Sequence, residues 1–131
     1  MPRGSCLCGA VRYDVREIRS LSNCHCSRCR RQHGAAYATY AEVASDDLSI
    51  SDEHDALQSF QSSAAVRREF CGRCGSKMFY RNEQHPHTLW IDAGTFDDDP
   101  GLTISAHHFA ASKANWYDID DDLPQHSAWE R

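Results

Sequence analysis

The chain has 131 residues, a length that predicts a single domain, residues 1–131, with enough chain to bury one hydrophobic core. Its formal net charge of -5 argues against a nucleic acid partner, because domains that bind nucleic acid usually carry a clustered basic surface. The N-terminus has no apolar signal segment, and no apolar run is long enough to cross a bilayer. We therefore expect a soluble cytoplasmic protein that binds neither nucleic acid nor membrane.

Short segments rich in β-branched and aromatic residues, separated by glycine, aspartate, serine and proline, predict that the chain is mostly strand. In chain order these segments are 10–15, 37–43, 47–51, 77–81, 88–96 and 102–109, and the polar stretch 51–63 contains a further strand. One or two helical turns are expected over 27–34, where Gly34 would end the helix. Trp90, Phe96 and Trp116 are expected in the core. The predicted fold class is all-β, built from short antiparallel sheets.

The seven cysteines fall into three groups along the chain. In a reducing compartment, closely spaced cysteines more often bind metal or react than form disulfides. A zinc ion with four protein ligands is usually structural, whereas three ligands leave a coordination position for water or substrate. Seven cysteines divide naturally into one site of each kind. The groups are Cys6 and Cys8, then Cys24, Cys26 and Cys29, then Cys71 and Cys74.

Local geometry favours one way of joining these groups. Cys6 and Cys8 would point to the same face of an extended strand and could chelate one ion. Gly72 and Gly75 let the backbone turn tightly around Cys71 and Cys74, which predicts a metal knuckle. Together these two pairs would make a closed four-thiolate site and leave Cys24, Cys26 and Cys29 as the open set. The alternative, in which the knuckle pairs with two of the middle cysteines, would leave three thiols without a metal.

Five ordered motifs, "GSCLCGAVRY", "CHCSRCRRQHG", "FCGRCGSKMFY", "IDAGTFDDDP" and "HHFAASKANWYDIDDDLPQ", closely resemble the glutathione-dependent formaldehyde-activating (Gfa-like) family, which includes the centromere protein V domain. The resemblance implies a β-tent fold and two zinc ions. It places a structural zinc on Cys6, Cys8, Cys71 and Cys74, and a second zinc on Cys24, Cys26 and Cys29. It also implies a carbon-sulfur lyase type of activity, the addition of glutathione to formaldehyde to give S-hydroxymethylglutathione.

The open site suits thiol chemistry. Zinc held by three thiolates can keep an incoming thiol deprotonated, and that thiolate would attack a small carbonyl such as formaldehyde to give a hemithioacetal. His33, beside the site, is a candidate hydrogen-bond donor or proton relay. We expect nearby cations to hold the carboxylates of a thiol such as glutathione. These cations are Arg28, Arg30, Arg31 and Lys113.

A second hypothesis is a non-catalytic binding module stabilised by zinc. In that case water, a partner or a histidine would complete the second metal site, with His25, His33 and His107 as the candidate histidines. The exchange of the fourth position with added thiol discriminates the two hypotheses. The aspartate runs 97–99 and 120–122 lack the alternating ligand spacing of a calcium loop, so we expect a turn and a charged surface there. The oligomeric state stays open.

Overall fold

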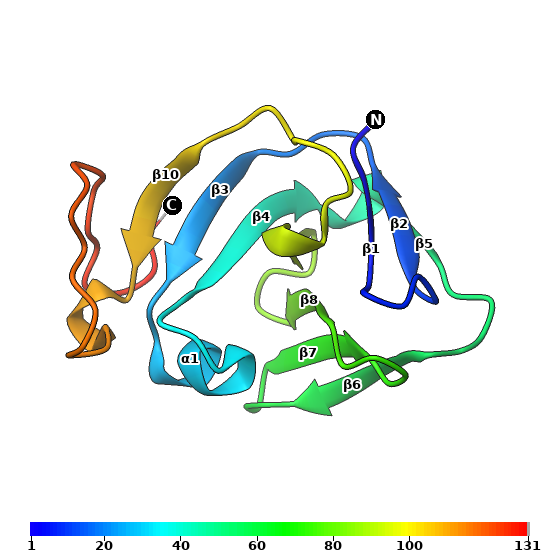
Figure 1. Ribbon diagram of the computed structural model, residues 1–131, viewed down its shortest axis with the longest axis horizontal. Coiled ribbons are helices and arrows are strands. Elements are labelled where there is room, and N and C mark those ends of the chain that lie inside the picture. Colours follow the sequence, from blue (N-terminus) through cyan, green and yellow to red (C-terminus); the bar gives the residue numbers. More distant parts are fainter. Residues whose placement is uncertain (131) are drawn as a thin grey trace.

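The computed structural model describes residues 1–130, and strands dominate it (Figure 1). This confirms the predicted all-β fold class. The strands are β1 (Arg3–Ser5), β2 (Arg12–Val15), β3 (Ser20–Cys24), β4 (Ala38–Ala44), β5 (Leu48–Ser51), β6 (Leu57–Gln61), β7 (Val66–Cys71), β8 (Lys77–Asn82), β9 (Thr88–Asp92) and β10 (Ile104–His108). The helical elements are α1 (Ser27–His33) and three 3-10 turns, η1 (Ser45–Asp47), η2 (Ala93–Thr95) and η3 (Ala110–Ser112).

The strands form two sheets. The small sheet has the order β1-β2-β5, and the large sheet has the order β10-β3-β4-β9-β8-β7-β6. Figure 1 shows β10, β3 and β4 side by side at one end of the view and the small sheet at the other. The pairing of β3 with β10 is parallel, which corrects the prediction of purely antiparallel sheets. Segments this far apart in sequence are not joined by a hairpin, so local turn signals do not set their direction.

Each predicted strand segment overlaps an observed strand, and the predicted helix is α1. The helix begins where the Cys26 sulfur accepts a hydrogen bond from the Cys29 amide at 3.3 Å, a capping interaction. It ends at Gly34, whose φ of 61° is the left-handed conformation that glycine adopts readily. The sequence did not predict β1, β3 or β7. These strands carry mostly polar and charged residues, and the periodic apolar signal is weak in them.

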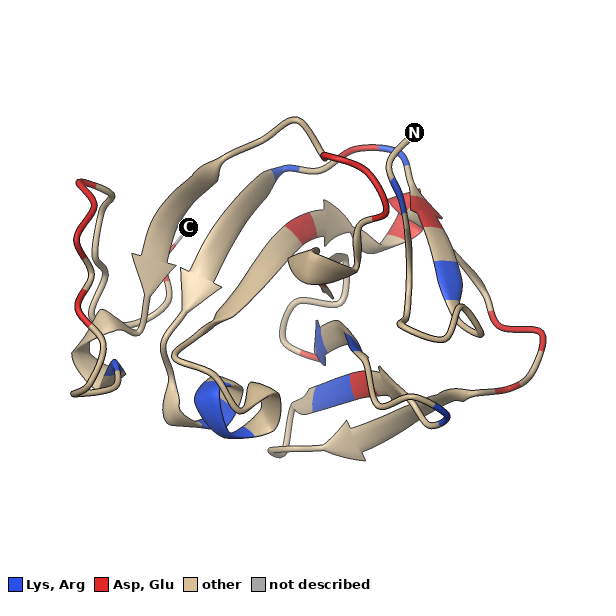
Figure 2. Cartoon of the chain, viewed as in Figure 1, with Lys and Arg blue, Asp and Glu red and all other residues tan. Residues whose placement is uncertain are grey.

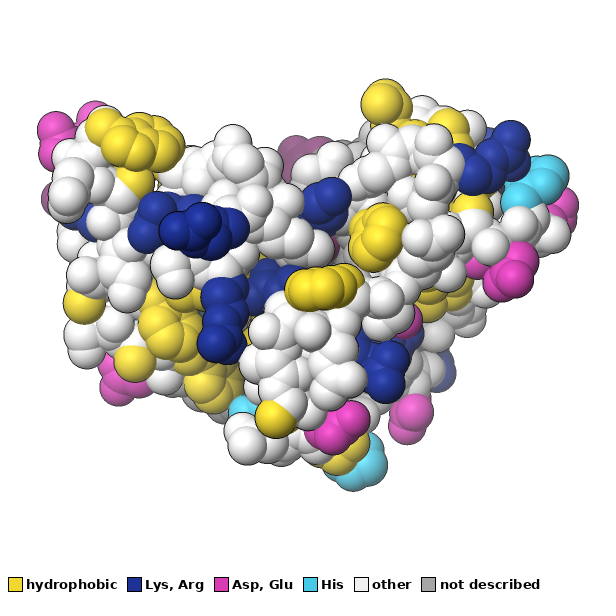
Figure 3. All heavy atoms as spheres, turned by 90° about the horizontal axis from the view of Figure 1, so that it is seen from below, with side chains coloured by type: hydrophobic (Ala, Val, Ile, Leu, Met, Phe, Trp, Pro, Cys, Tyr) yellow, Lys and Arg dark blue, Asp and Glu magenta, His cyan; other side chains and the backbone are white. Residues whose placement is uncertain are grey.

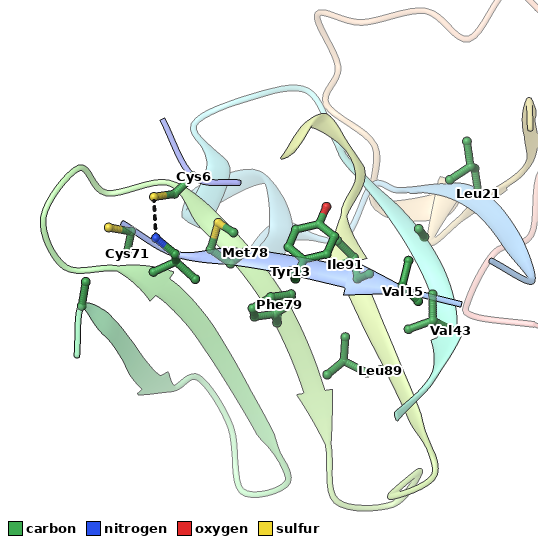
Figure 4. Close-up of a cluster of buried hydrophobic side chains, with 13 residues drawn as sticks. Cys6, Tyr13, Val15, Leu21, Val43, Cys71, Met78, Phe79, Leu89 and Ile91 are labelled. Carbon is green, nitrogen blue, oxygen red and sulfur yellow. Dashed lines mark hydrogen bonds between the residues drawn. The ribbon is translucent and has the colours of Figure 1, made fainter. Parts of the chain in front are cut away.

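The main hydrophobic core lies between the small sheet and the large sheet. Tyr13 of β2 packs edge-on against Phe79 of β8, with ring centroids 5.5 Å apart, and against Phe96 at 5.8 Å. Figure 4 shows this core with Cys6 and Cys71 at one end of it. The core therefore ends at a pair of thiols, and it joins the N-terminal strands to the middle of the chain.

The three aromatic residues predicted for the core differ in how deeply they are buried. Trp90 is buried, and Phe96 is half-buried and packs against the main core. Trp116 is 74% exposed, so its prediction was wrong. It belongs to the segment after η3, which lies along the outside of β10 and contacts it through hydrogen bonds such as His107 N–H to Pro124 O at 2.9 Å. No helix among residues 1–130 combines the length and the apolar composition needed to span a membrane.

Candidate functional site

Four cysteines from distant parts of the chain converge into one cluster, and these are Cys6, Cys8, Cys71 and Cys74. Their sulfur atoms all lie within 4.8 Å of one another. The Cys8 sulfur is 3.7 Å from that of Cys6 and 3.8 Å from that of Cys71. Zinc–sulfur bonds of about 2.3 Å place the sulfurs of a tetrahedral site roughly 3.8 Å apart. The cluster therefore fits a closed four-thiolate metal site.

Two tight turns build this cluster. Cys6 and Cys8 lie in the turn between β1 and β2, where the Gly9 amide donates to Cys6 O at 3.1 Å. The expected extended strand at Cys6 and Cys8 was wrong, because the chain reverses there, yet the turn also brings both thiols together. The tight turn expected after β7 is present, since Gly75 has a φ of 82° and its amide donates to Cys71 O at 2.7 Å.

Hydrogen-bond donors point at the sulfurs of the four-cysteine cluster. The Val11 amide donates to the Cys6 sulfur at 3.3 Å. The Ser76 hydroxyl lies 3.3 Å from the Cys74 sulfur and is the main cause that lowers the pKa of Cys74 to about 5. Donors directed at sulfur stabilise thiolates, which are the form that binds metal. The surroundings of the cluster therefore agree with its donor set.

The second cluster contains Cys24 at the end of β3, Cys26 at the start of α1 and Cys29 within α1. Their three sulfurs also lie within 4.8 Å of one another. Hydrogen bonds from Cys24 and then from Cys29 lower the pKa of Cys26. Within residues 1–130, no histidine or carboxylate brings a ligand atom into this group. The cluster is therefore a three-thiol set without a fourth protein ligand in the described chain.

The histidines proposed as internal fourth ligands are engaged elsewhere. His25 Nε2 bonds His107 Nδ1 at 2.8 Å, and His107 Nε2 bonds Asp121 Oδ2 at 2.9 Å. Burial lowers the pKa of His25 to about 4, and His107 adds to the effect, so the His25 ring is neutral. His33 Nε2 lies 3.4 Å from the Tyr40 hydroxyl. The hydrogen bonds from the buried His25 through His107 to the exposed Asp121 therefore fix the loop that carries Cys24 and Cys26 to the C-terminal segment.

Arg68 of β7 lies against the three-cysteine cluster, and sequence reasoning missed it. It is only 4% exposed. Its Nη1 atom is 3.6 Å from the Cys29 sulfur and 3.3 Å from the Tyr40 hydroxyl, and its guanidinium lies 5.1 Å from the centroid of the Tyr80 ring. Its Nε atom donates to Ser62 Oγ at 3.0 Å. The side chain is thus held from several sides and directed at the cysteine sulfur.

Arg68 brings a buried positive charge next to the three-cysteine cluster. None of the ion pairs within residues 1–130 includes Arg68. Burial alone would lower the pKa of its guanidinium, but the negative charge of Cys29, followed by Tyr40, raises that pKa overall. A buried cation without a partner is strongly unfavourable. A thiolate at Cys29, the form that ligates metal, would supply the counter-charge of Arg68.

The three-cysteine cluster opens into a cavity of about 600 Å³. All three cysteines line it, together with the cations Arg28 and Arg68. Figure 2 shows cations on α1 and on β7, and Figure 3, a view onto the end of the molecule with α1 and β6, shows cations next to hydrophobic side chains. This volume is within the range of pockets that bind small molecules.

The other predicted substrate contacts lie outside the lining of this cavity. Arg30 Nε lies 3.4 Å from the His25 carbonyl oxygen, and Lys113 Nζ donates to Tyr117 O at 2.9 Å. His33 does not line the cavity, and its Nε2 atom lies 3.4 Å from the Tyr40 hydroxyl. The same atom is 3.1 Å from Asp92 Oδ1, without the alignment of a hydrogen bond. The structure thus brings Arg28 to the cavity and ties Arg30 and Lys113 to the backbone of the segments around it.

A nearly all-β fold with a closed four-thiol cluster and an open three-thiol cluster beside a cavity defines a cysteine-rich protein with two candidate metal sites. The family model described as "Glutathione-dependent formaldehyde-activating enzyme" matches residues 1–112. The chain belongs to this family, as its motifs indicated.

Relatives agree with this membership. The chain is 28% identical over 117 residues to an "Uncharacterized lyase" of Schizosaccharomyces pombe, a match that covers 88% of this chain and 83% of the relative. It is 29% identical over 125 residues to a "Putative glutathione-dependent formaldehyde-activating enzyme" of Halomonas elongata, covering 89% and 80%. A crystal structure of a Rhodobacter sphaeroides protein has a similar fold, with a TM-score of 0.63 at 24% identity over 77% of this chain and 90% of that one.

Proposed function

We propose that the chain is a single zinc-binding domain that binds a small thiol at the Cys24, Cys26 and Cys29 cluster and adds it to a small carbonyl compound. This is the carbon-sulfur lyase reaction in its synthetic direction. The observation that carries the proposal is the cluster itself: three sulfurs converge at the wall of a cavity, and no fourth ligand joins them within residues 1–130. Glutathione and formaldehyde are the substrates that the family description supports.

Two zinc ions per chain fit the donor sets. Cys6, Cys8, Cys71 and Cys74 would hold a structural ion, because a fourfold thiolate shell leaves no position for substrate. Cys24, Cys26 and Cys29 would hold the second ion. When bound there, zinc supplies an open position for the sulfur of a thiol and favours its thiolate form near neutral pH.

The reaction balances without an oxidant. The thiol loses its proton, a carbon–sulfur bond forms between the thiolate and the carbonyl carbon, and the carbonyl electron pair moves to oxygen, which then takes up a proton. Arg68 stabilises negative charge at Cys29 through its Nη1 atom, 3.6 Å from the sulfur. Arg28 lines the cavity mouth and is exposed, so it can pair with an acidic group of the thiol.

Tyr40 and His33 act as positioning residues in this proposal. The Tyr40 hydroxyl is 3.4 Å from both the Cys29 sulfur and His33 Nε2. Burial, reinforced by Arg68, lowers the pKa of His33 to about 4, so its ring is neutral at pH 7 and can accept a hydrogen bond. His33 therefore orients the hydroxyl beside the metal site.

Cobalt substitution tests the proposal. Adding 2-mercaptoethanol to the cobalt-loaded protein should increase the thiolate-to-metal charge-transfer absorption, because a further sulfur enters the coordination sphere. The increase should be absent in Cys26→Ser and present in Arg73→Ser, a control at an exposed position between two cysteines of the other cluster. The apparent affinity should rise with pH through the ionisation of the thiol. No spectral change with 2-mercaptoethanol or glutathione would refute the proposal and favour a non-catalytic zinc-stabilised module.

A further inference from the structure

A run of aromatic rings leads away from the cysteine sulfurs along the cavity. It begins at Tyr40, whose hydroxyl is 3.4 Å from the Cys29 sulfur, and continues to Tyr80 at a centroid distance of 5.7 Å. Trp90 follows at 5.5 Å from Tyr80, and Trp129 follows at 6.2 Å from Trp90. These spacings are typical of favourable ring contacts. We call Tyr80, Trp90 and Trp129 the aromatic wall.

The aromatic wall belongs to the cavity as well as to the core. All three residues line the cavity, and Tyr80 and Trp129 are only half-buried, so part of each ring faces open space. Exposed apolar surface of this kind in a concave site usually marks the position of a ligand. The wall therefore offers a ligand an apolar face that begins next to the metal site.

Trp129 comes from the C-terminal segment, beyond residues 1–112 that the family model matches. The Glu130 amide donates to His108 Nδ1 at 3.2 Å and holds this segment against β10. The Trp129 ring also packs against His85 at 5.4 Å and against His108 at 6.1 Å. The segment is thus anchored where it completes the cavity, and it can set a substrate preference that the matched part of the chain does not encode.

The charges of the cavity lie at its sulfur end. Arg28 and Arg68 are the arginines among its described lining residues, and no lysine lines it. Asn82 and Gln84 also line the cavity, and both side chains are neutral. Burial lowers the pKa of His108, so this ring is neutral as well. Arg68 reaches the wall only at its near end, over Tyr80, whereas Trp90 and Trp129 pack against rings of aromatic residues and histidines. An apolar group would replace water against these two tryptophans.

We propose that the substrate pair of this protein carries a flat apolar substituent that packs against the aromatic wall while sulfur occupies the three-cysteine site. The proposal rests on the thiol addition proposed above, with an aromatic reactant in place of glutathione or formaldehyde, neither of which carries a ring. The substituent can belong to the thiol or to the carbonyl compound, since the product of their addition contains both. In either case the bond that forms is carbon to sulfur, the carbonyl electron pair moves to oxygen, and that oxygen takes up the proton that the thiol has lost.

Binding measurements on the zinc-loaded protein test this proposal in two arms. The first compares benzyl mercaptan with 2-mercaptoethanol, and the second compares benzaldehyde with acetaldehyde at saturating 2-mercaptoethanol. We expect the aromatic member of at least one pair to bind about tenfold more tightly or better, because a ring is removed from water. This preference should disappear in Trp129→Ala and persist in Trp116→Ala, whose side chain is 74% exposed and does not line the cavity.

A second readout is independent of affinity and of activity. The protein has three tryptophans, and each gives one indole N–H resonance in a nitrogen-15 correlation spectrum. The aromatic ligand should shift the Trp90 and Trp129 resonances and leave that of Trp116 in place, since the first two line the cavity. Single Trp→Phe variants assign the three signals.

The outcomes separate this inference from the proposed function. Binding of 2-mercaptoethanol with no preference in either arm would overturn the aromatic substrate and leave the thiol site standing. An aromatic preference that survives in Trp129→Ala, or ligand shifts at Trp116 alone, would overturn it too. If 2-mercaptoethanol does not enter the cobalt coordination sphere, the proposed function fails first and this inference fails with it. A preference in one arm that Trp129→Ala removes supports the proposal and says which reactant carries the substituent.

Discussion

Replacing Arg68 with methionine removes the buried charge beside the three-cysteine site and keeps a long unbranched side chain in its place. The Nη1 atom is 3.6 Å from the Cys29 sulfur, and two unit charges at this distance attract by about 5 kcal/mol at an effective dielectric constant of about 20. Desolvation offsets much of this attraction, and a hydrogen bond to a charged group contributes a net of about 1.5–3 kcal/mol. We therefore expect Arg68→Met to weaken metal binding at this site by roughly 10–100-fold.

The assay is a competition between the protein and a chromophoric chelator for zinc, which resolves the more weakly held ion. Arg67→Met is the matched control, because Arg67 neighbours Arg68 on β7 but is exposed. The zinc affinity of Arg68→Lys should lie between those of the wild type and Arg68→Met. Lysine keeps the charge but lacks the guanidinium group that contacts both Cys29 and Tyr40. Wild-type zinc affinity in a folded Arg68→Met protein would refute the view that the thiolates are the counter-charge of Arg68.

Three further predictions concern metal and pH. Cys74→Ser should prevent cooperative thermal unfolding, because the four-cysteine cluster joins distant chain segments, whereas Cys26→Ser should melt close to the wild type; equal melting curves would contradict the division of the sites. Mild chelation should leave about one zinc per chain by metal analysis, since a closed site holds its ion better than an open one. Burial raises the pKa of Asp92 to about 7, so the folded state binds this proton more tightly than the unfolded state. The contribution of Asp92 to stability should therefore fall between about pH 4 and pH 7, and Asp92→Asn should flatten this decline in urea unfolding. An unchanged pH profile would refute the shift.

Local patterns in the sequence predicted the parts of the fold that depend on neighbouring residues. Alternating apolar and β-branched residues located β4, β8 and β9, and Gly34 located the end of α1. The cysteine pairs and the cysteine triplet were predicted because ligand spacing within each motif is also local. The division of seven thiols into four and three then joined the two distant pairs into one cluster. The geometry at Cys6 and Cys8 was wrong in detail, since a turn and a strand can both bring two such thiols to one ion.

The parts that sequence reasoning missed depend on contacts between distant segments. Arg68 lies in "VRREFC", which is typical of a charged surface stretch. Its burial depends on contacts with Cys29 of α1 and Tyr40 of β4. Strand alternation offered the one usable signal, because Arg67 and Arg68 must point to opposite faces. The aromatic wall joins β8, β9 and the C-terminal segment, and no local pattern specifies that juxtaposition.

Charge balance at the open site connects the fold to the proposed chemistry. Three thiolates around a divalent ion would carry a formal charge of about -1. The single charge of Arg68 would offset it, so that this buried unit would be close to neutral. An incoming thiolate restores a negative charge in a partly buried cavity, where it is costly. Addition to a carbonyl removes that charge, because the product oxygen takes up a proton and the sulfur becomes a neutral thioether, a weaker ligand than a thiolate. In the proposed reaction the same balance would therefore favour both thiolate attack and release of the neutral product.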